Sequence, residues 1–266
     1  MRGRTRLLVR CASALLVGAA VGGAAAAATD PAAIDWQPVA DFEIARTETT
    51  VAQFRAFVQA TGTVTLAERR GGGEVYEAGW VKKPGWTWRA PFGPGHRVAD
   101  DEPAVHVTWH EAAAFCRWAG GRLPSDAQWS GGAYTEQRER PPPPFERART
   151  YALPTGESAA GAQCLDDCGA QARQRAVRHG ATLLRGHGHA RVGSTPAGVN
   201  GLFDMGGNAW EWVDDPPGAR GAEERRTRGG SWWYGAAQMR RDHHQAKPPD
   251  TAVVYIGFRC ARPRPR

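Results

Sequence analysis

Thiols are the most reactive side chains in this sequence, and five cysteines carry them: Cys11, Cys116, Cys164, Cys168 and Cys260. Cys11 lies in an N-terminal segment that we expect to be removed, which leaves an even number. An even number of cysteines in an exported chain predicts two disulfides. The simplest of the three possible connectivities joins Cys164 to Cys168 and Cys116 to Cys260. A zinc site on Cys-Leu-Asp-Asp-Cys is the alternative, but no matching second pair exists to complete it.

Two short segments contain histidines at spacings that resemble those of metal ligands. In an Asp-His-His segment, the adjacent side chains of His243 and His244 would point to opposite faces of a strand, so they could not share one ion there. In a Gly-His-Gly-His segment, the spacing of His187 and His189 would suit a strand, but the glycines indicate a loop. We therefore expect these histidines to be hydrogen-bonded or exposed to solvent.

The N-terminal segment has the composition of a secretory signal peptide. Residues 1–10 contain four arginines and no acid, residues 11–28 are uncharged and rich in Ala, Val, Leu and Gly, and three alanines end the segment. A retained membrane anchor is the alternative, but this composition is only weakly hydrophobic. We predict a signal peptide at residues 1–28, a periplasmic or secreted location, and no membrane span after its removal.

Export also changes the charge of the chain. The 266 residues have a formal net charge of +7, and four of these charges belong to the signal segment, which leaves +3 on 238 residues. This modest charge argues against nucleic acid as a partner. A chain of 238 residues suits one domain with a substantial core.

Caps and apolar periodicity predict a few regular elements. Thr108, followed by Glu111 three residues later, has the spacing of a capping box at the start of a helix. Residues 67–102 and 131–190 have no sustained periodicity and are expected to be largely irregular. The expected elements are a strand within residues 34–41, a helix that opens at 48–50 and ends at Gly62, a helix over 110–119, a short helix from 122–126 through Trp129, and a strand over 253–260.

Five segments match a family pattern in the same order. They are Glu-Thr-Thr-Val at 48–51 leading into Phe54 and Phe57, Pro-Ala-Val-His-Val-Thr-Trp at 103–109, Phe-Cys-Arg-Trp-Ala-Gly-Gly-Arg-Leu-Pro-Ser at 115–125, Asn-Gly-Leu-Phe-Asp-Met-Gly-Gly-Asn-Ala-Trp-Glu-Trp at 200–212, and Arg-Gly-Gly-Ser-Trp at 228–232 closed by Gly-Phe-Arg-Cys at 257–260. Each string alone is a weak signal, but five in order are specific. Over residues 35–262 the chain resembles the sulfatase-modifying factor family, which includes the formylglycine-generating enzymes.

The resemblance implies a single domain of mixed α/β (α+β) class, a variant of the C-type lectin fold with little regular secondary structure. It also implies a disulfide between Cys116 and Cys260, in agreement with the simplest pairing above. A structural calcium ion is implied at the Asp-x-x-Gly-Asn-Ala-Trp-Glu turn, where oxygen ligands of the kind that calcium prefers can converge. A turn held by side-chain hydrogen bonds alone is the alternative. The implied ligands are the carboxylates of Asp204 and Glu211 and the backbone carbonyls of Gly207 and Ala209.

Formylglycine-generating enzymes oxidise a peptide cysteine with molecular oxygen and copper(I), which two cysteines hold three and eight residues after the serine of Arg-Gly-Gly-Ser. Here Tyr234 and Met239 stand at those positions. A phenol and a thioether cannot replace two soft thiolates. The resemblance therefore does not extend to this reaction, copper is not expected as a cofactor, and the catalytic residues, if any, are unknown.

A ligand groove could persist around those positions. Trp210, Ser231 and Trp232 match residues that line the family's site, and nearby arginines could donate to a carboxylate or a peptide. Core packing by the tryptophans and loop bridging by the arginines are the alternative roles. The candidate groove comprises Trp210, Arg228, Ser231, Trp232, Tyr234, Met239, Arg240 and Arg241.

The sequence favours an accessory or maturation factor of the cell envelope, acting as a monomer, whose groove binds a peptide, protein or small-molecule ligand. In this interpretation Trp80, Trp86 and Trp88 would add an aromatic wall. The alternative is an oxidoreductase of the formylglycine-generating enzyme family that modifies a peptide cysteine or a small molecule such as a siderophore precursor. A formylglycine generator with a different mechanism is a third possibility.

Overall fold

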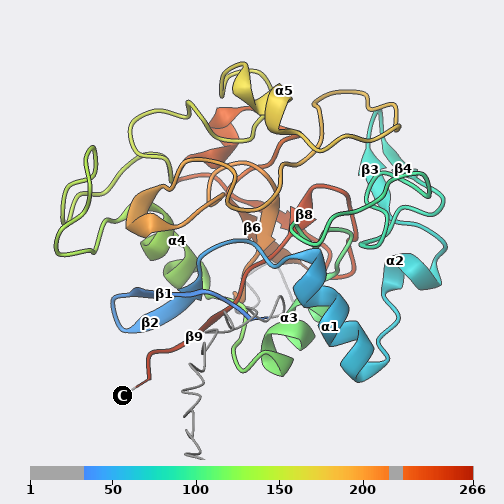
Figure 1. The fold of residues 1–266 in the computed structure, drawn as a ribbon, viewed down its shortest axis with the longest axis horizontal. Helices are drawn as coiled ribbons and strands as arrows, with labels where there is room; N and C mark the ends of the chain where they lie inside the picture. Colours follow the sequence, from blue (N-terminus) through green and yellow to red (C-terminus); the bar gives the residue numbers. More distant parts are fainter. Residues whose placement is uncertain (1–32, 216–223, 266) are drawn as a thin grey trace, which may run out of the picture. The chain divides into compact units, whose positions relative to one another are not determined.

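The computed structural model describes residues 33–215 and 224–265, which lie in one unit of the chain (Figure 1). The predicted signal peptide falls outside the described residues. None of the helices within the described ranges has the length and apolar character that a bilayer crossing requires. The helices are α1 (Val51–Thr61), α2 (Leu66–Arg69), α3 (Trp109–Trp118), α4 (Asp126–Tyr134) and α5 (Gln171–Arg175), with 3₁₀ turns at Val199–Gly201 and Ala236–Met239.

A capping box opens each of the first four helices. Thr50, Thr65, Thr108 and Ser125 each accept a hydrogen bond from the backbone N–H three residues later, and the Gln or Glu at that later position binds the backbone N–H of the cap. Helix α1 ends at Gly62, whose φ of 68° is the left-handed conformation that glycine adopts without strain. These caps confirm the predicted starts of α1 and α3.

Three small sheets contain all the named strands of the described ranges. Their orders are β1-β2-β9, β3-β4 and β7-β6-β5-β8, and β5 pairs with β8 in parallel while the other pairs are antiparallel. The strands are β1 (Trp36–Val39), β2 (Phe42–Ala45), β3 (Glu74–Tyr76), β4 (Trp80–Lys82), β5 (Trp210–Trp212), β6 (Arg225–Arg228), β7 (Gln245–Lys247), β8 (Ile256–Gly257) and β9 (Ala261–Pro263). Short strands and long connections agree with the predicted mixed α/β class.

Two local expectations were wrong, while residues 67–102 are largely irregular as expected, apart from the short β3–β4 hairpin and the end of α2. Helix α4 continues past Trp129 to Tyr134. Residues 253–260 are buried throughout, but only Ile256–Gly257 forms a strand. The backbone carbonyls of this segment accept hydrogen bonds from separate parts of the chain, because Val253 pairs with His106, Phe258 with Thr49 and Cys260 with Ala45. One ladder therefore cannot form along its whole length.

The main core is aromatic and joins α1, α3 and the C-terminal segment. Phe54 of α1 contacts Phe115 of α3, Phe258 and Trp88 at ring-centroid distances of 5.2 to 6.2 Å. The disulfide between Cys116 and Cys260 lies in the same cluster and links α3 to the segment after β8. In Figure 1, α5 and the long loops of residues 140–190 lie on the side away from α3.

Candidate functional site

The segment that follows β6 turns sharply. It carries Tyr234 and Met239, which stand where the formylglycine-generating enzymes have their two copper-binding cysteines. Gly229 and Gly230 have φ angles of 97° and 76°, and a Cβ on Gly229 would lie 2.7 Å from the carbonyl oxygen of Met205, so glycine is required there. After this turn, Tyr234 is half-buried and Met239 is fully buried. The soft, charged ligands that copper(I) needs are absent from this pair, and copper does not fit here.

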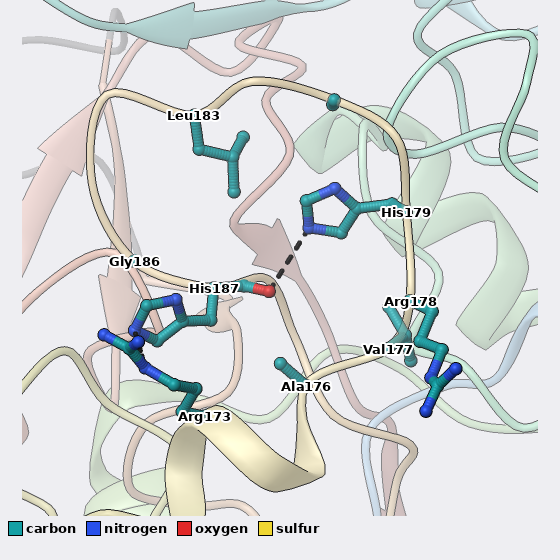
Figure 2. A pocket seen from close by; sticks show the side chains of 9 residues that line it. Arg173, Ala176, Val177, Arg178, His179, Leu183, Gly186 and His187 are labelled. Atoms are coloured by element: carbon teal, nitrogen blue, oxygen red, sulfur yellow. Dashed lines mark hydrogen bonds between the residues drawn. The ribbon is translucent and has the colours of Figure 1, made fainter.

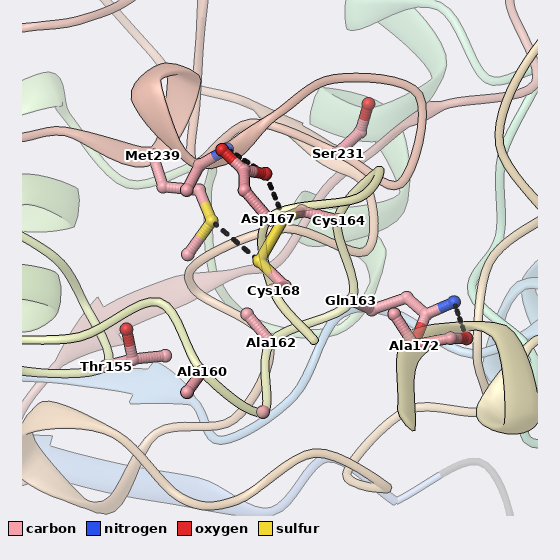
Figure 3. Close-up of a disulfide and its surroundings, with 12 residues drawn as sticks. Thr155, Ala160, Ala162, Gln163, Cys164, Asp167, Cys168, Ala172, Ser231 and Met239 are labelled. Atoms are coloured by element: carbon pink, nitrogen blue, oxygen red, sulfur yellow. Dashed lines mark hydrogen bonds between the residues drawn. A yellow bond between two sulfur atoms is a disulfide. The ribbon is translucent and has the colours of Figure 1, made fainter. Parts of the chain in front are cut away.

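Met239 packs against a disulfide rather than facing a ligand site. Cys164 and Cys168 are bonded, and the Sγ atom of Cys168 lies 3.9 Å from the Sδ atom of Met239 (Figure 3). Together with the bond between Cys116 and Cys260, this confirms the predicted pairing. Every cysteine within residues 33–215 and 224–265 is therefore oxidised, and none of them offers a free thiol.

The other candidate groove residues divide into buried and exposed groups. Trp210, Ser231 and Trp232 are almost completely buried, whereas Arg240 and Arg241 are exposed. Arg228 is also buried. It donates to both carboxylate oxygens of Asp126 at 2.5 and 2.7 Å and to the backbone carbonyls of Arg241 and His243. Arg228 thus bridges segments, and the groove as a ligand site stays a prediction.

The expected aromatic wall does not form. Trp88 is fully buried in the main core and Trp86 is 7% exposed, so only Trp80 of the three, 48% exposed, presents its ring to solvent. Trp80 lies on β4, where its ring contacts Tyr76 of β3 at 5.4 Å. The sequence identified the loop tryptophans but could not show that two of them complete the core.

A cavity that the sequence did not predict lies beside the buried Trp232. It has a volume of about 550 Å³ and is open to solvent (Figure 2). The loop that surrounds the cavity packs closely on the segment that follows β6. A Cβ atom on Gly186 would lie only 2.8 Å from the Trp232 ring. The polar residues of the lining are Arg173, Arg178, His179 and His187. This composition suits an anionic group, such as a carboxylate.

Both histidines of this cavity make hydrogen bonds within its loop. Nε of Arg173 donates to Nε2 of His187 at 3.2 Å. Nε2 of His179 lies 3.2 Å from the carbonyl oxygen of His187, and burial lowers the pKa of His179. The positive charges of the lining thus come from Arg173 and Arg178.

A buried carboxylate attaches the cavity loop to the core. Glu102 Oε2 accepts hydrogen bonds from Nε2 of His96 at 2.9 Å and Nε2 of His189 at 2.8 Å. Burial alone would raise the pKa of Glu102, but the hydrogen bonds from His189 and His96 outweigh it and lower the pKa to about 2. His189 was expected to be hydrogen-bonded or exposed, and it is hydrogen-bonded. Its partner could not be found from the sequence, since 87 positions separate the two residues.

The proposed calcium ligands lie in a cluster of buried acids. Both oxygens of Glu211 accept hydrogen bonds from Arg259, at 2.6 and 2.7 Å, and one also accepts from Trp129. Asp204 accepts from the Gly193 backbone and the Thr195 hydroxyl, both at 2.6 Å. The two carboxylates thus face different partners.

Glu48 adds a third acid to this cluster, and sequence reasoning missed its role. It accepts hydrogen bonds from the side chain of Asn208 and the backbone N–H of Ala209. Burial, followed by the nearby charges of Asp204 and Glu211, raises the pKa of Glu48 well above its usual range. Three acids with one arginine favour a cation electrostatically, but within the part of the chain that the structure describes, protein groups donate the hydrogen bonds to all three carboxylates. Calcium at Asp204, Gly207, Ala209 and Glu211 therefore stays a prediction.

A family model described as the sulfatase-modifying factor enzyme 1-like domain matches residues 13–264. The formylglycine-generating enzyme of Thermomonospora curvata is 33% identical over 190 residues, which cover 61% of this chain and 56% of that protein. The mouse protein named inactive C-alpha-formylglycine-generating enzyme 2 is 31% identical over 140 residues, which cover 50% of this chain and 39% of that protein. The chain thus spans little more than half the length of the formylglycine-generating enzyme that it matches.

Among solved structures, that of PvdO from Pseudomonas aeruginosa superimposes with a TM-score of 0.57 at 24% identity. The match covers 84% of this chain and 80% of the other. At this level of identity the similarity concerns the fold, and it supports the C-type-lectin-like variant implied by the motifs.

Proposed function

The chain belongs to the sulfatase-modifying factor family, and from this premise we propose that it is an accessory or maturation factor of the cell envelope that does not generate formylglycine with copper. The observation that carries the proposal is the pair Tyr234 and Met239. Met239 is buried against a disulfide, and the thiolates that would bind copper(I) are missing from both positions.

The cavity beside Trp232 supports a role in binding. Arg173 and Arg178 can each donate charge-assisted hydrogen bonds to a carboxylate, which are stronger than neutral ones. Peptides and proteins carry such groups at acidic side chains and C-termini. We propose that an acidic polypeptide segment occupies this cavity, with the protein acting as a monomer. Export to the periplasm or to the medium is part of the same proposal.

The first experiment tests the missing reaction. The purified protein is supplied with copper, oxygen and a peptide that contains Cys-x-Pro-x-Arg, and the peptide mass is followed. We expect no conversion of cysteine to aldehyde, while the Thermomonospora curvata enzyme converts the same peptide in a parallel reaction. Aldehyde formed by the protein itself would refute this part of the proposal.

The second experiment tests binding. A fluorescein-labelled peptide of alternating glutamate and alanine is titrated with the protein, and anisotropy gives the Kd. Arg173→Ala and Arg178→Ala should each weaken binding by about tenfold, the loss typical of a hydrogen bond to a charged group. Arg117→Ala is the matched control, because Arg117 is exposed, lies on α3 and belongs neither to the cavity lining nor to the candidate groove. Equal affinity in all four proteins would exclude the cavity as the site.

An oxidoreductase that acts on a peptide cysteine or a small molecule, such as a siderophore precursor, is the second candidate. The similarity to a formylglycine-generating enzyme favours it. It requires a redox centre other than Tyr234 and Met239. Oxygen consumption by the purified protein with a thiol substrate would support it, and a flat oxygen trace would favour the accessory role.

A further inference from the structure

The loop that surrounds the cavity belongs to a stretch of the sequence without acidic residues. Residues 168–203 contain five arginines and no Asp or Glu. Two of these arginines are engaged within the fold, because Arg191 pairs with Asp101 and Arg175 donates to two backbone carbonyls. Within the described ranges, no carboxylate pairs with the remaining three, which are Arg173, Arg178 and Arg185. The surface of this loop is therefore positively charged.

Arg185 differs from the other two because aromatic rings hold its guanidinium. The guanidinium carbon lies 4.9 Å from the centre of the Tyr234 ring and 5.3 Å from that of Trp233. Both rings pack in turn on Tyr255, at centroid distances of 5.7 Å for Tyr234 and 5.5 Å for Trp233. Since Trp233 and Tyr255 are fully buried, the core fixes the aromatic platform that Trp233 and Tyr234 form under Arg185.

We propose that Arg185 is a second anion-binding residue, at the rim of the cavity, and that Tyr234 positions it. This inference rests on the proposed function, and it assigns the ligand to acidic segments that carry at least two carboxylates. Arg185 directly precedes Gly186, which lines the cavity and packs on Trp232. A segment that places one carboxylate in the cavity and leaves it on this side therefore meets Arg185 with its next acidic residue.

The aromatic platform prepares Arg185 for binding. A long exposed side chain loses rotamer freedom when it binds a ligand, and this loss weakens binding. Cation–π contacts restrict Arg185 in advance, while its N–H donors stay available for two parallel hydrogen bonds to a carboxylate. Arg185 is exposed, so a carboxylate can reach it from solvent. The phenol ring of Tyr234, which cannot hold copper, thus supports a cation.

The charge of the surroundings selects an anionic ligand over a cationic one. A cation on the same rings would have to displace Arg185 and would approach the positive charges of Arg173 and Arg178 on the same loop. No acid of residues 168–203 could attract it, because this stretch has none. An anion instead gains favourable contacts with all three arginines.

The first test compares two unlabelled peptides by isothermal titration calorimetry. Both are amidated and equally long, and they carry either one glutamate or alternating glutamates. In Arg185→Ala, the affinity for the alternating peptide should fall by about tenfold, the loss typical of a hydrogen bond to a charged group. The affinity for the single-glutamate peptide should fall less. An equal fall for both peptides would overturn the assignment to segments with two carboxylates.

Variants of Tyr234 test its positioning role with the alternating peptide. Tyr234→Leu removes a ring under Arg185 and should weaken binding by about two- to fivefold, the size of an exposed cation–π contact. Tyr234→Phe keeps a ring and should restore the parent affinity. In Arg185→Ala/Tyr234→Leu, the loss should equal that of Arg185→Ala alone, since no guanidinium is left to position. Losses that multiply in the double variant would overturn the positioning role. Circular dichroism checks folding.

The outcomes separate this inference from the proposed function. If Arg173→Ala and Arg178→Ala weaken binding while Arg185→Ala matches the control Arg117→Ala, the cavity is the site and the inference about Arg185 is wrong. If Arg185→Ala weakens binding and the two cavity variants do not, Arg185 is confirmed as an anion-binding residue and the cavity loses its proposed role. Equal affinity in all of these proteins would refute both.

Discussion

The two disulfides lie in regions that are held together in different ways. The bond between Cys116 and Cys260 spans 144 residues and sits among the aromatic rings of the main core. The bond between Cys164 and Cys168 spans four residues in a small cluster within the irregular loops. In the chain-entropy description, a cross-link stabilises a protein according to the length of the loop that it closes. The first bond is therefore expected to stabilise the protein more than the second, which closes a short loop.

The loops of residues 135–198 compensate for their irregular backbone with polar side chains. Buried backbone groups need hydrogen-bond partners, which ladders provide only in regular elements. Asn200 donates to the carbonyls of Gly132 and Thr135 and accepts from the N–H of Gln137. Gln163 donates to the carbonyls of Ala172 and Gly188 in the same way. Aromatic packing thus stabilises the first region, and hydrogen bonds from a few buried polar side chains stabilise the second.

The largest expected effect comes from removing the core disulfide. Cys116→Ala/Cys260→Ala should lower the free energy of unfolding by about 5 kcal/mol, because the unfolded chain regains the freedom of a long loop. Urea unfolding followed by tryptophan fluorescence measures the change against the parent protein. If the free energy of unfolding fell by only about 1 kcal/mol or less, the aromatic packing alone would be sufficient to stabilise this region.

Breaking the buried ion pair beside this disulfide should have the next largest effect. Arg259→Met leaves Glu211 buried without its guanidinium partner and should cost about 3–5 kcal/mol. The double variant Glu211→Leu/Arg259→Met removes both charges and should recover part of that loss. A double variant less stable than Arg259→Met would show that Glu211 has a favourable role apart from Arg259, as expected if a cation binds there.

Acid should lower the free energy of unfolding of the protein in two steps. Burial lowers the pKa of His106 from 6.5 to about 4, so the unfolded chain takes up a proton first and stability falls as the pH drops from 6.5 towards 4. The pKa of Glu102 is lowered from 4.5 to about 2, so a second loss follows as the pH drops from 4.5 towards 2. Each step is worth a few kcal/mol, about 1.4 per unit of pKa.

Urea unfolding at a series of pH values measures both steps. The variant His106→Asn lacks the titrating ring, and asparagine tolerates the φ of 57° at this position. It should reduce the first step and keep the second. If this variant still lost the full amount of stability between pH 6.5 and 4, that loss would belong to other histidines. His189 and His179 are the candidates, because burial also lowers their pKa values.

The smallest effect should follow removal of the loop disulfide. Cys164→Ala/Cys168→Ala should cost about 2 kcal/mol, since the loop that it closes is short. The measurement is the same urea unfolding as for Cys116→Ala/Cys260→Ala, so the two double variants form a matched pair. A loss equal to that of the core pair would contradict the division between the two regions.

The sequence by itself determined the local features and the family. Thr108 predicted the start of its helix, because a capping box is encoded within four residues, and the first helix was expected to open at 48–50, where Thr50 caps it. The ordered motifs identified the family, and the resemblance gave the bond between Cys116 and Cys260. Tyr234 and Met239 could be recognised as replacements because their spacing from Ser231 is fixed. Each of these features depends on residues that are close in the sequence or on a pattern of motifs along it.

The tertiary structure alone decided the contacts across the irregular loops. The chain path brings Glu102 to His189 and Met239 to Cys168, which are 87 and 71 positions apart. It also buries Trp88, which the sequence presented as part of an exposed wall. In helices and strands, the position of a residue in the sequence determines the direction of its side chain, but loops lack this periodicity. Which of their side chains meet therefore depends on the packing of the whole domain.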